Sequence, residues 1–322
     1  MKGTYLVTVG NSALQYKFEI RRNITIIKGD SATGKTTLVE MIGEYYENGE
    51  NSGITLNCKK PCVVLEGRQW KYLLDNIHDS IVFIDEGNNF IATDEFASAV
   101  KESDNYYVIV TRENLPNLPY SVDEIYGIKS SGKYASLQQT YHEFYHIYGD
   151  YDNRKTFVPN IIMVEDSNSG FEFFDTVSAN KSWKVVSAEG KSNIFKMLNE
   201  YKNEKILVIA DGAAFGSEMD KIMKRVNSRV GISVYLPESF EWLILSSELI
   251  KDSDIEDILA NSSDYVESQK YMSWERYFTA LLVEKTKDTY LQYSKSKLNE
   301  AYKTDRVQNK VLKEIPDNLM LQ

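Results

Sequence analysis

The order of hydrophobic and polar positions predicts two successive sheets, each built from strands that alternate with helices. The chain begins with alternating runs, and two antiparallel strands are expected to lead into a buried strand, ITII, at residues 24–27. Amphipathic helices are then interleaved with buried strands at residues 81–84 and 106–110. Because strands that alternate with helices run mostly parallel, the pattern favours a largely parallel sheet.

A domain boundary is predicted near residues 148–160, where periodicity is lost and turn formers accumulate. Beyond it, strands and helices alternate again, from NIIMVE to ISVYL. The remaining residues show apolar positions at the spacing of helices. We therefore expect an α/β protein with a first domain at residues 1–150, a second α/β domain with a parallel sheet at 158–245 and a helical tail at 246–322.

Composition and charge fit a globular protein and limit its partners. Hydrophobic residues make up 42% and charged residues 26%, which excludes a disordered chain. The net charge of −10 excludes a basic face over the whole protein, so any nucleic-acid contact must be local. Residues 285–313 hold eight bases and three acids, which is typical of a solvated helix face or of a contact with phosphates or a partner.

Targeting signals and a zinc site are not expected. The apolar stretch at the N-terminus is too short for a secretory signal, and no window reaches the length of a membrane span. Cys58 and Cys62 have no further cysteine or nearby histidine that would complete a zinc site. We expect free thiols, a cytoplasmic location and no membrane contact.

A phosphate-binding loop is predicted directly after the strand at residues 24–27. The segment from Gly29 to Thr36 satisfies GxxxxGK[ST] and opens a helix, as this motif requires. Glycines let the backbone approach phosphate, and the helix N-terminus adds partial positive charge. Lys35 supplies a charge to the β- and γ-phosphates, and the hydroxyl of Thr36 suits Mg²⁺. With ATP and Mg²⁺ as cofactors, the binding residues are Gly29, Asp30, Ser31, Ala32, Thr33, Gly34, Lys35, Thr36 and Thr37.

Two carboxylates follow the buried strand at residues 81–84, the arrangement called Walker B. Asp85 is expected to hold Mg²⁺, and Glu86 to orient and deprotonate the attacking water. The next buried strand ends in Thr111 and Arg112, either of which is placed to contact the γ-phosphate, although an ordinary loop has the same pattern. The predicted catalytic residues are Glu86, Lys35 and Arg112.

A zinc-protease pattern, HExxH, occurs from His142 to His146 but is interpreted as part of a strand. Both histidines would have to lie on one face of a helix to bind zinc. The surrounding residues, TYHEFYHIY, alternate and favour a strand instead.

The first 130 or so residues resemble ABC-type and related recombination and repair ATPases. The resemblance rests on the antiparallel strands before the phosphate loop and on the adjacent pair Asp85 and Glu86. No LSGGQ-like signature lies between the two motifs. Such ATPases usually complete their active sites across subunits, so the resemblance implies self-association, as a dimer or a dimer-based assembly. Arg112 is then a candidate for reaching the phosphate of a neighbouring subunit.

Polar loops follow three strands of the second domain at one expected sheet edge. The first strand ends at Glu165, the second is followed by Gly190 and its neighbours, and the third ends at Asp211. This order resembles the TOPRIM domain of topoisomerases, primases and OLD-family nucleases. The resemblance covers about residues 158–245 and implies that Glu165 and Asp211 are ligands of a magnesium ion.

One metal-binding residue of the TOPRIM family has no counterpart in this chain. Position 213 is Ala, where the family has a second aspartate. A metal site would therefore need another carboxylate, and the candidates are Asp220, Glu218 and Glu238. Without one of them, the second domain would have no metal site.

An ABC-type ATPase followed by a TOPRIM-like domain is the layout of OLD-family and related phage-defence proteins. It implies that the nucleotide state of the first domain controls an effector domain, which could be a Mg²⁺-dependent nuclease in nucleic-acid processing. The alternative is a nucleotide-gated sensor or scaffold without nuclease activity, which binds a protein partner. Either nucleic acid or a protein partner could contact the TOPRIM-like domain and the basic tail.

Overall fold

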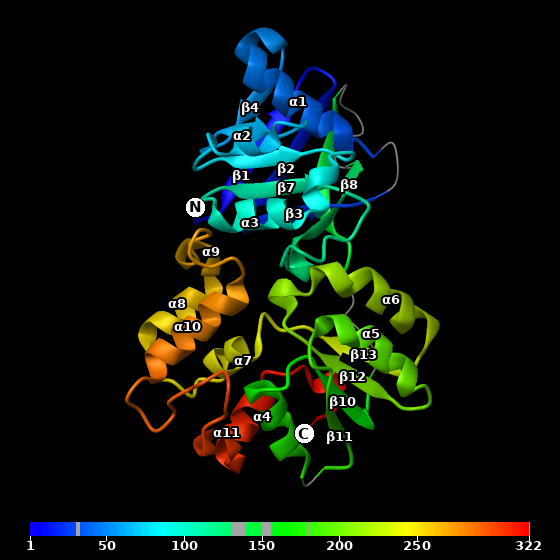
Figure 1. The fold of residues 1–322 in the computed structure, drawn as a ribbon, viewed down its shortest axis with the longest axis vertical. Coiled ribbons are helices and arrows are strands. Elements are labelled where there is room, and N and C mark those ends of the chain that lie inside the picture. Colours follow the sequence, from blue (N-terminus) through cyan, green and yellow to red (C-terminus); the bar gives the residue numbers. More distant parts are fainter. Residues whose placement is uncertain (30–32, 131–138, 150–155, 180, 322) are drawn as a thin grey trace. The chain divides into compact units, whose positions relative to one another are not determined.

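The computed structural model describes residues 1–29, 33–130, 139–149, 156–179 and 181–321 (Figure 1). The chain divides into two compact α/β units. Unit 1 comprises Met1–Gly149 with Asn261–Ser273, and unit 2 comprises Asp150–Ala260 with Trp274–Gln322. The helical region that we expected as a separate tail is thus shared between the two units.

Unit 1 is built on a mixed sheet, whose described strands follow the order β4-β1-β2-β9-β8-β3-β7-β6-β5. Their bounds are β1 (Tyr5–Gly10), β2 (Leu14–Ile20), β3 (Ile24–Ile27), β4 (Thr55–Asn57), β5 (Cys62–Val64), β6 (Ile81–Ile84), β7 (Tyr106–Val110), β8 (Ile125–Ser130) and β9 (Thr140–His146). From β5 to β8 all neighbours are parallel, whereas β1 pairs antiparallel with β2 and β4, and β9 with β8. Every residue of β3, β6 and β7 is buried, as expected of parallel strands covered on both faces.

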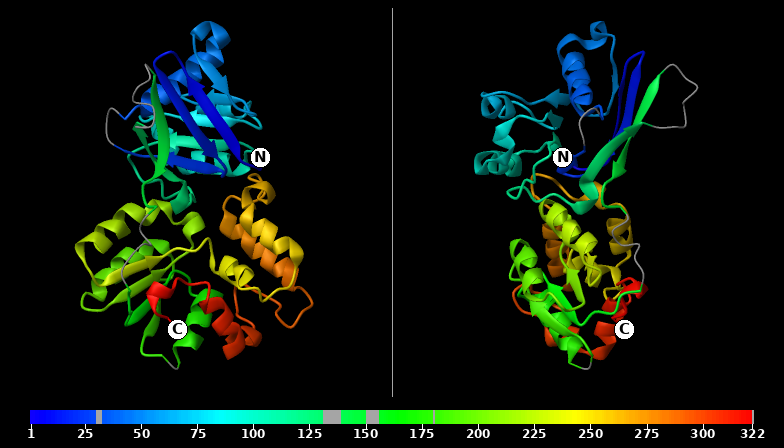
Figure 2. Two further views of the ribbon diagram at one scale, coloured as in Figure 1. Left: turned by 180° about the vertical axis from the view of Figure 1, so that it is seen from behind. Right: turned by 90° about the vertical axis from the view of Figure 1, so that its right-hand side faces the viewer.

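The sheet of unit 1 curls around one helix and carries others on its second face. The helices are α1 (Lys35–Asn48), α2 (Trp70–Leu74), α3 (Asp94–Glu102) and α9 (Ser262–Tyr265), with 3₁₀ turns at Gly49–Ser52, Asn89–Ala92 and Val122–Glu124. The rings of Phe18 on β2 and Phe83 on β6 lie 6.3 Å apart, although other strands separate β2 from β6 in the sheet. α1 packs inside this curve, beside β1 (Figure 2). On the other face, Phe96 of α3 contacts Tyr107 of β7.

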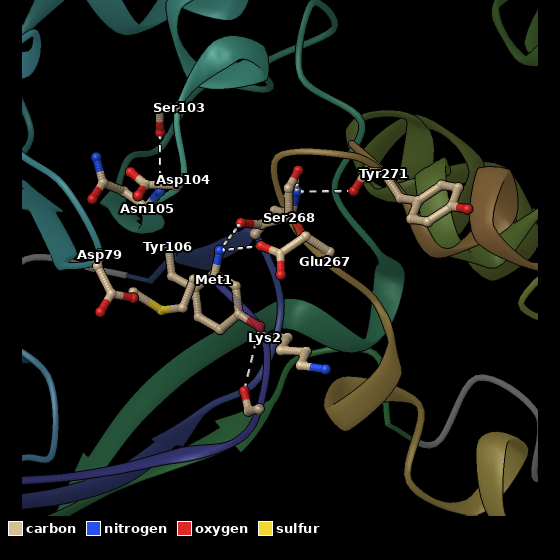
Figure 3. A network of polar contacts seen from close by, with 12 residues as sticks. Met1, Lys2, Asp79, Ser103, Asp104, Asn105, Tyr106, Glu267, Ser268 and Tyr271 are labelled. Atoms are coloured by element: carbon tan, nitrogen blue, oxygen red, sulfur yellow. Dashed lines mark hydrogen bonds and ion pairs between the residues drawn. The ribbon is translucent and has the colours of Figure 1, made fainter.

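The segment Asn261–Ser273 belongs to unit 1, although it comes from late in the chain (Figure 3). The α-ammonium of Met1 donates to the hydroxyl of Ser268 at 2.7 Å, and the amide of Ser268 donates to the carbonyl of Met1 at 2.8 Å. The side-chain amide of buried Asn23 donates to the carbonyls of Ser268 and Tyr271, at 3.1 and 3.2 Å. These hydrogen bonds hold the segment against the N-terminus and against Asn23, which precedes β3.

Replacement of Asn23 by alanine should lower the free energy of unfolding of unit 1 by about 1–3 kcal/mol, because two carbonyls lose their donor in a buried place. Urea denaturation measures this change. Asn76→Ala is the matched control, since the Asn76 side chain also donates to a carbonyl, that of Tyr72, but at an exposed position. It should change stability by less than about 0.5 kcal/mol. Equal effects of the two variants would contradict the role of Asn23.

Unit 2 contains a smaller sheet, in which all described strands are parallel and follow the order β11-β10-β12-β13. The strands are β10 (Ile161–Val164), β11 (Lys184–Ser187), β12 (Ile206–Ile209) and β13 (Ile232–Tyr235). The helices are α4 (Ser169–Ser178), α5 (Lys191–Glu200), α6 (Met219–Ser228), α7 (Phe240–Ser246), α8 (Ser253–Ala260), α10 (Trp274–Thr286) and α11 (Asp305–Leu312), with 3₁₀ turns at Gly212–Ala214, Gly216–Glu218, Glu300–Lys303 and Asp317–Leu319. In the described part of the whole chain, no helix has both the length and the apolar character that a membrane crossing requires.

Candidate functional site

The loop with the phosphate-binding pattern joins β3 to α1 in unit 1. Of its predicted residues, Gly29, Thr33, Gly34, Lys35, Thr36 and Thr37 are described, whereas Asp30, Ser31 and Ala32 lie outside the described residues. Gly29 has a φ of 136°, and Gly34, the N-cap of α1, has a φ of 86°. Side chains rarely adopt such values, so the backbone of this loop requires glycine at both positions.

Lys35 folds back over the loop from the first turn of α1. Its side chain is buried, and Nζ donates to the carbonyl of Gly29 at 2.9 Å and to the hydroxyl of Thr33 at 3.1 Å. Thr36 is exposed beside it. The first amides of a helix have no acceptor within the helix. An ammonium, a hydroxyl and these amides thus gather at one helix end, which is a donor set that suits phosphate.

Tyr16 of β2 packs against the end of the phosphate-binding loop at Gly34, a contact that the sequence pattern did not predict. The side chain is fully buried, its hydroxyl donates to the carbonyl of Gly34 at 2.9 Å, and its ring stacks on His142. A Cβ at residue 34 would lie 2.6 Å from that hydroxyl, so packing also requires Gly34. Burial raises the pKa of Tyr16 to about 12, which keeps the hydroxyl a donor at neutral pH. The alternation of β2 could have placed Tyr16 inside, but not against this loop.

The HExxH residues lie in β9, so the helix that zinc binding would need is not formed. His142 stacks on Tyr16 with 4.7 Å between the ring centroids, and His146 lies against Tyr126 at 4.6 Å. Burial lowers the pKa of His142, which favours the neutral ring. These contacts assign the histidines to packing within the sheet.

Asp85 and Glu86 come directly after β6, at the sheet edge where the phosphate loop follows β3. β7 lies between these strands and runs parallel to both, so the three strands end at the same edge. Oδ1 of Asp85 is buried and has no hydrogen-bond partner in the part of the chain that the structure describes. A buried carboxylate oxygen is unfavourable unless a donor or a cation pairs with it. Asp85 therefore fits the role of a Mg²⁺ ligand.

Glu86 and Arg112 form an ion pair at this edge. Arg112 Nε lies 2.8 Å from Glu86 Oε1, and the two side chains are 54% and 38% exposed, so both are accessible to a ligand. Thr111 is buried, and its hydroxyl accepts a hydrogen bond from the amide of Glu113 at 3.0 Å. Of the two residues that we considered for a γ-phosphate contact, Arg112 is the accessible one, whereas Thr111 stabilises the turn after β7.

In unit 2, Glu165 and Asp211 lie next to each other at the ends of β10 and β12. Oε2 of Glu165 accepts from the backbone amide of Asp211 at 3.1 Å, and Oδ1 of Asp211 accepts from the amide of Phe240 at 3.2 Å. Burial, together with the negative charge of neighbouring carboxylates such as Glu275, raises the pKa of both side chains. The fold thus places Glu165 and Asp211 next to each other at one edge of the sheet.

The residues around Glu165 and Asp211 do not fit the magnesium site that we expected there. Among the described residues, no three His, Cys, Asp or Glu side chains are gathered so that they could hold a metal ion. Ala213 has no side-chain oxygen that could bind a metal, and its amide donates to the backbone carbonyl of Glu238 at 3.2 Å. Glu218 pairs with Lys221 at 3.2 Å. None of the three candidate replacements, Asp220, Glu218 and Glu238, completes a metal cluster.

Three of the basic residues at 285–313, Lys285, Lys295 and Lys303, form ion pairs, and several of their acidic partners lie outside that stretch. Lys285 contacts Asp252 at 2.5 Å, and Lys295 contacts Glu275 at 2.6 Å. Nζ of Lys310 donates to the carbonyl of Glu248 at 3.0 Å. The net positive charge of the stretch is therefore reduced locally, which weakens the case for a phosphate contact.

No family model, curated protein or solved structure matches this chain.

Proposed function

We propose that unit 1 binds ATP with Mg²⁺ and hydrolyses it. One observation supports this most directly. The buried Oδ1 of Asp85, which has no hydrogen-bond partner among the described residues, follows β6 at the edge where Lys35 begins α1 after β3. A buried carboxylate oxygen without a partner is unfavourable unless a cation binds it. A chance match to the phosphate-loop motif after β3 would not explain why Asp85 buries such an oxygen at the same sheet edge.

Each residue of this edge has a role in the proposal. The backbone amides of the loop and the ammonium of Lys35 bind the phosphates, and Thr36 and Asp85 hold Mg²⁺, which neutralises charge on the phosphate oxygens. Glu86 accepts the proton of the attacking water, and Arg112 holds the Glu86 carboxylate at 2.8 Å. Tyr16 keeps the loop in place through the carbonyl of Gly34.

Asp85→Asn tests the metal part of this proposal. The variant keeps the shape of the side chain but loses its charge, so ATP should bind with at least about 10-fold lower affinity in Mg²⁺, whereas affinity without Mg²⁺ should change little. Titration calorimetry with and without EDTA measures both. Asp94→Asn, at the start of α3, is the matched control and should leave both affinities unchanged. If Asp85→Asn and wild type depend equally on Mg²⁺, Asp85 is not a metal ligand.

We further propose that the chain is related to the ABC-type and OLD-like ATPases and that its nucleotide state controls unit 2 as an effector. The order of an ATPase-like unit and a parallel α/β unit supports this, as does the pairing of β3, β7 and β6. Three parts of this proposal rest on similarity of fold alone. They are the relation to these ATPases, a role in antiviral defence, and self-association as a dimer or dimer-based assembly. Light scattering with and without a non-hydrolysable ATP analogue tests the assembly, and a monomer in both states would contradict it.

For unit 2 we favour a sensor or scaffold that binds a protein partner over a Mg²⁺-dependent nuclease. The observation that favours it is that, among the described residues, no three His, Cys, Asp or Glu side chains are arranged to hold a metal ion, although Asp166 lies beside Glu165 and Asp211. Incubation with single- and double-stranded DNA and RNA, in Mg²⁺ or Mn²⁺, should give no cleavage. Cleavage that Asp211→Ala abolishes would instead favour the nuclease.

A further inference from the structure

Unit 2 contains more acidic side chains near Asp211 than the sequence pattern indicated. Glu241 on α7 is 1% exposed, and its Oε2 has no hydrogen-bond partner among the described residues. Glu275 lies on α10, and its charge, like those of Glu165 and Glu241, raises the pKa of Asp211 in addition to burial. Carboxylates that share a partly buried space repel one another unless a cation lies among them.

Lys295 lies among these acids. Its Nζ is 2.6 Å from Oε1 of Glu275 and 3.8 Å from Oε1 of Glu241. Burial lowers the pKa of Lys295, but the charges of Glu241, Glu275 and Asp211 outweigh it and hold the pKa above its ordinary value. The ammonium is therefore charged, contacts carboxylates from α7 and α10, and is stabilised by the charge of Asp211 at the end of β12.

The backbone that presents Lys295 is fixed to the same group of residues. The carbonyl of Lys295 accepts from the amide of Ser169 at 3.3 Å. Two residues earlier, the hydroxyl of Tyr293 donates to Glu241 Oε1 at 2.9 Å and lies 2.6 Å from the hydroxyl of Ser169. Hydrogen bonds thus hold the segment in place at Tyr293 and at Lys295, the two residues that contact the acids. The position of Lys295 is therefore more restricted than that of a solvated surface lysine.

We propose that Lys295 is the fixed counter-ion of this acidic cluster and takes the place of the divalent metal ion that the resemblance implied. The inference rests on our proposal that unit 2 works without a bound metal, and it is independent of nucleotide binding by unit 1. A lysine supplies one positive charge where Mg²⁺ supplies two. Ala213, at the position where the resemblance expects an aspartate, agrees with that smaller charge.

The cavity beside Glu165 and Asp211 has little room for a hydrated metal ion. Glu165, Asp166 and Asp211 line a cavity of about 20 Å³, which has room for about one water molecule. Mg²⁺ usually keeps several of its waters and requires an octahedral arrangement of oxygens. The oxygens of Asp166 are moreover used by the amides of Gly170 and Phe171, at 3.2 and 2.8 Å.

The experiment compares Lys295→Met with Lys297→Met, a matched change two residues away at an exposed position. All variants carry Asp85→Asn and are measured without nucleotide, so that the proposed metal site of unit 1 does not contribute. Lys295→Met should lower the midpoint of thermal unfolding by at least about 4 °C, because it leaves acids without their cation, whereas Lys297→Met should leave the midpoint unchanged. Equal midpoints for the two variants would overturn the proposal.

Metal binding provides the second readout. Titration of the Lys297→Met protein with Mn²⁺, followed by calorimetry, should show no binding that depends on Asp211. Binding that the further change Asp211→Asn removes would overturn the proposal, since a metal would then occupy the cluster together with Lys295. If Lys295→Met does not yield folded protein, adding Glu241→Gln and Glu275→Gln should restore folding, because the charges that need the cation are gone. The proposal would also be overturned if this triple variant did not fold while the protein with only Glu241→Gln and Glu275→Gln did.

Discussion

Replacement of Lys35 by alanine should abolish ATP binding by unit 1, with a loss of affinity of at least about 100-fold, which corresponds to about 2.7 kcal/mol. The reason is that Lys35 brings a buried ammonium to the loop, within 2.9 Å of the Gly29 carbonyl and 3.1 Å of the Thr33 hydroxyl. The β- and γ-phosphates need a positive charge at this place, and water that fills the vacated space does not supply one. Titration calorimetry or a fluorescent ATP analogue measures the affinity.

Two controls make this result specific. Lys101→Ala removes a lysine from the exposed end of α3 and should leave ATP affinity unchanged. Because Lys35 also ties the loop together, the unfolding midpoints of wild type and Lys35→Ala should be compared without nucleotide, and a folded variant is required. Undiminished binding by folded Lys35→Ala would exclude this loop as the nucleotide site.

The sequence predicted the central strands of unit 1 and the glycine-containing loop after β3 because both leave strong local signals. Buried parallel strands appear as unbroken apolar runs, and β3, β6 and β7 begin and end within a residue or two of the predicted runs. The glycines of the loop are required by their positive φ values, so Gly29 and Gly34 are visible in the sequence for a physical reason. The same local logic placed Asp85, Glu86, Glu165 and Asp211 at strand ends.

What the sequence could not predict depends on contacts between distant residues. The curl that brings Phe18 to Phe83, and Tyr16 to Gly34, follows from the packing of the whole sheet around α1. Segment 261–273 joins unit 1 mainly through backbone carbonyls, which every residue has, so no residue type marks it.

The basic stretch at 285–313 shows the same limit for charge. The stretch itself is positively charged, whereas the acids that pair with Lys285 and Lys295 are Asp252 and Glu275, which precede it. Glu241 and Glu275 lie on helices whose apolar spacing indicated only core packing. A counter-ion and its acids can therefore be recognised only when the fold has brought them together.

Glu86→Gln should reduce ATP hydrolysis by a factor of about 10² or more while ATP still binds, because an amide cannot accept the proton of the attacking water. Steady-state phosphate release and calorimetric affinity separate the two effects. Glu113→Gln, an exposed glutamate near the same sheet edge, is the control and should retain full activity. Unchanged hydrolysis by Glu86→Gln would show that another group activates the water.

Arg112→Ala decides how the ion pair with Glu86 acts. In the structure the pair is formed within one chain, with 2.8 Å between Nε and Oε1, so Arg112 orients the carboxylate. Its loss should slow hydrolysis, and less than Glu86→Gln does, because the base itself remains. Faster hydrolysis would mean instead that Arg112 holds Glu86 away from water. If Arg112 also reaches the phosphate of a neighbouring subunit, the specific activity of wild type should rise with protein concentration, and this rise should disappear in Arg112→Ala.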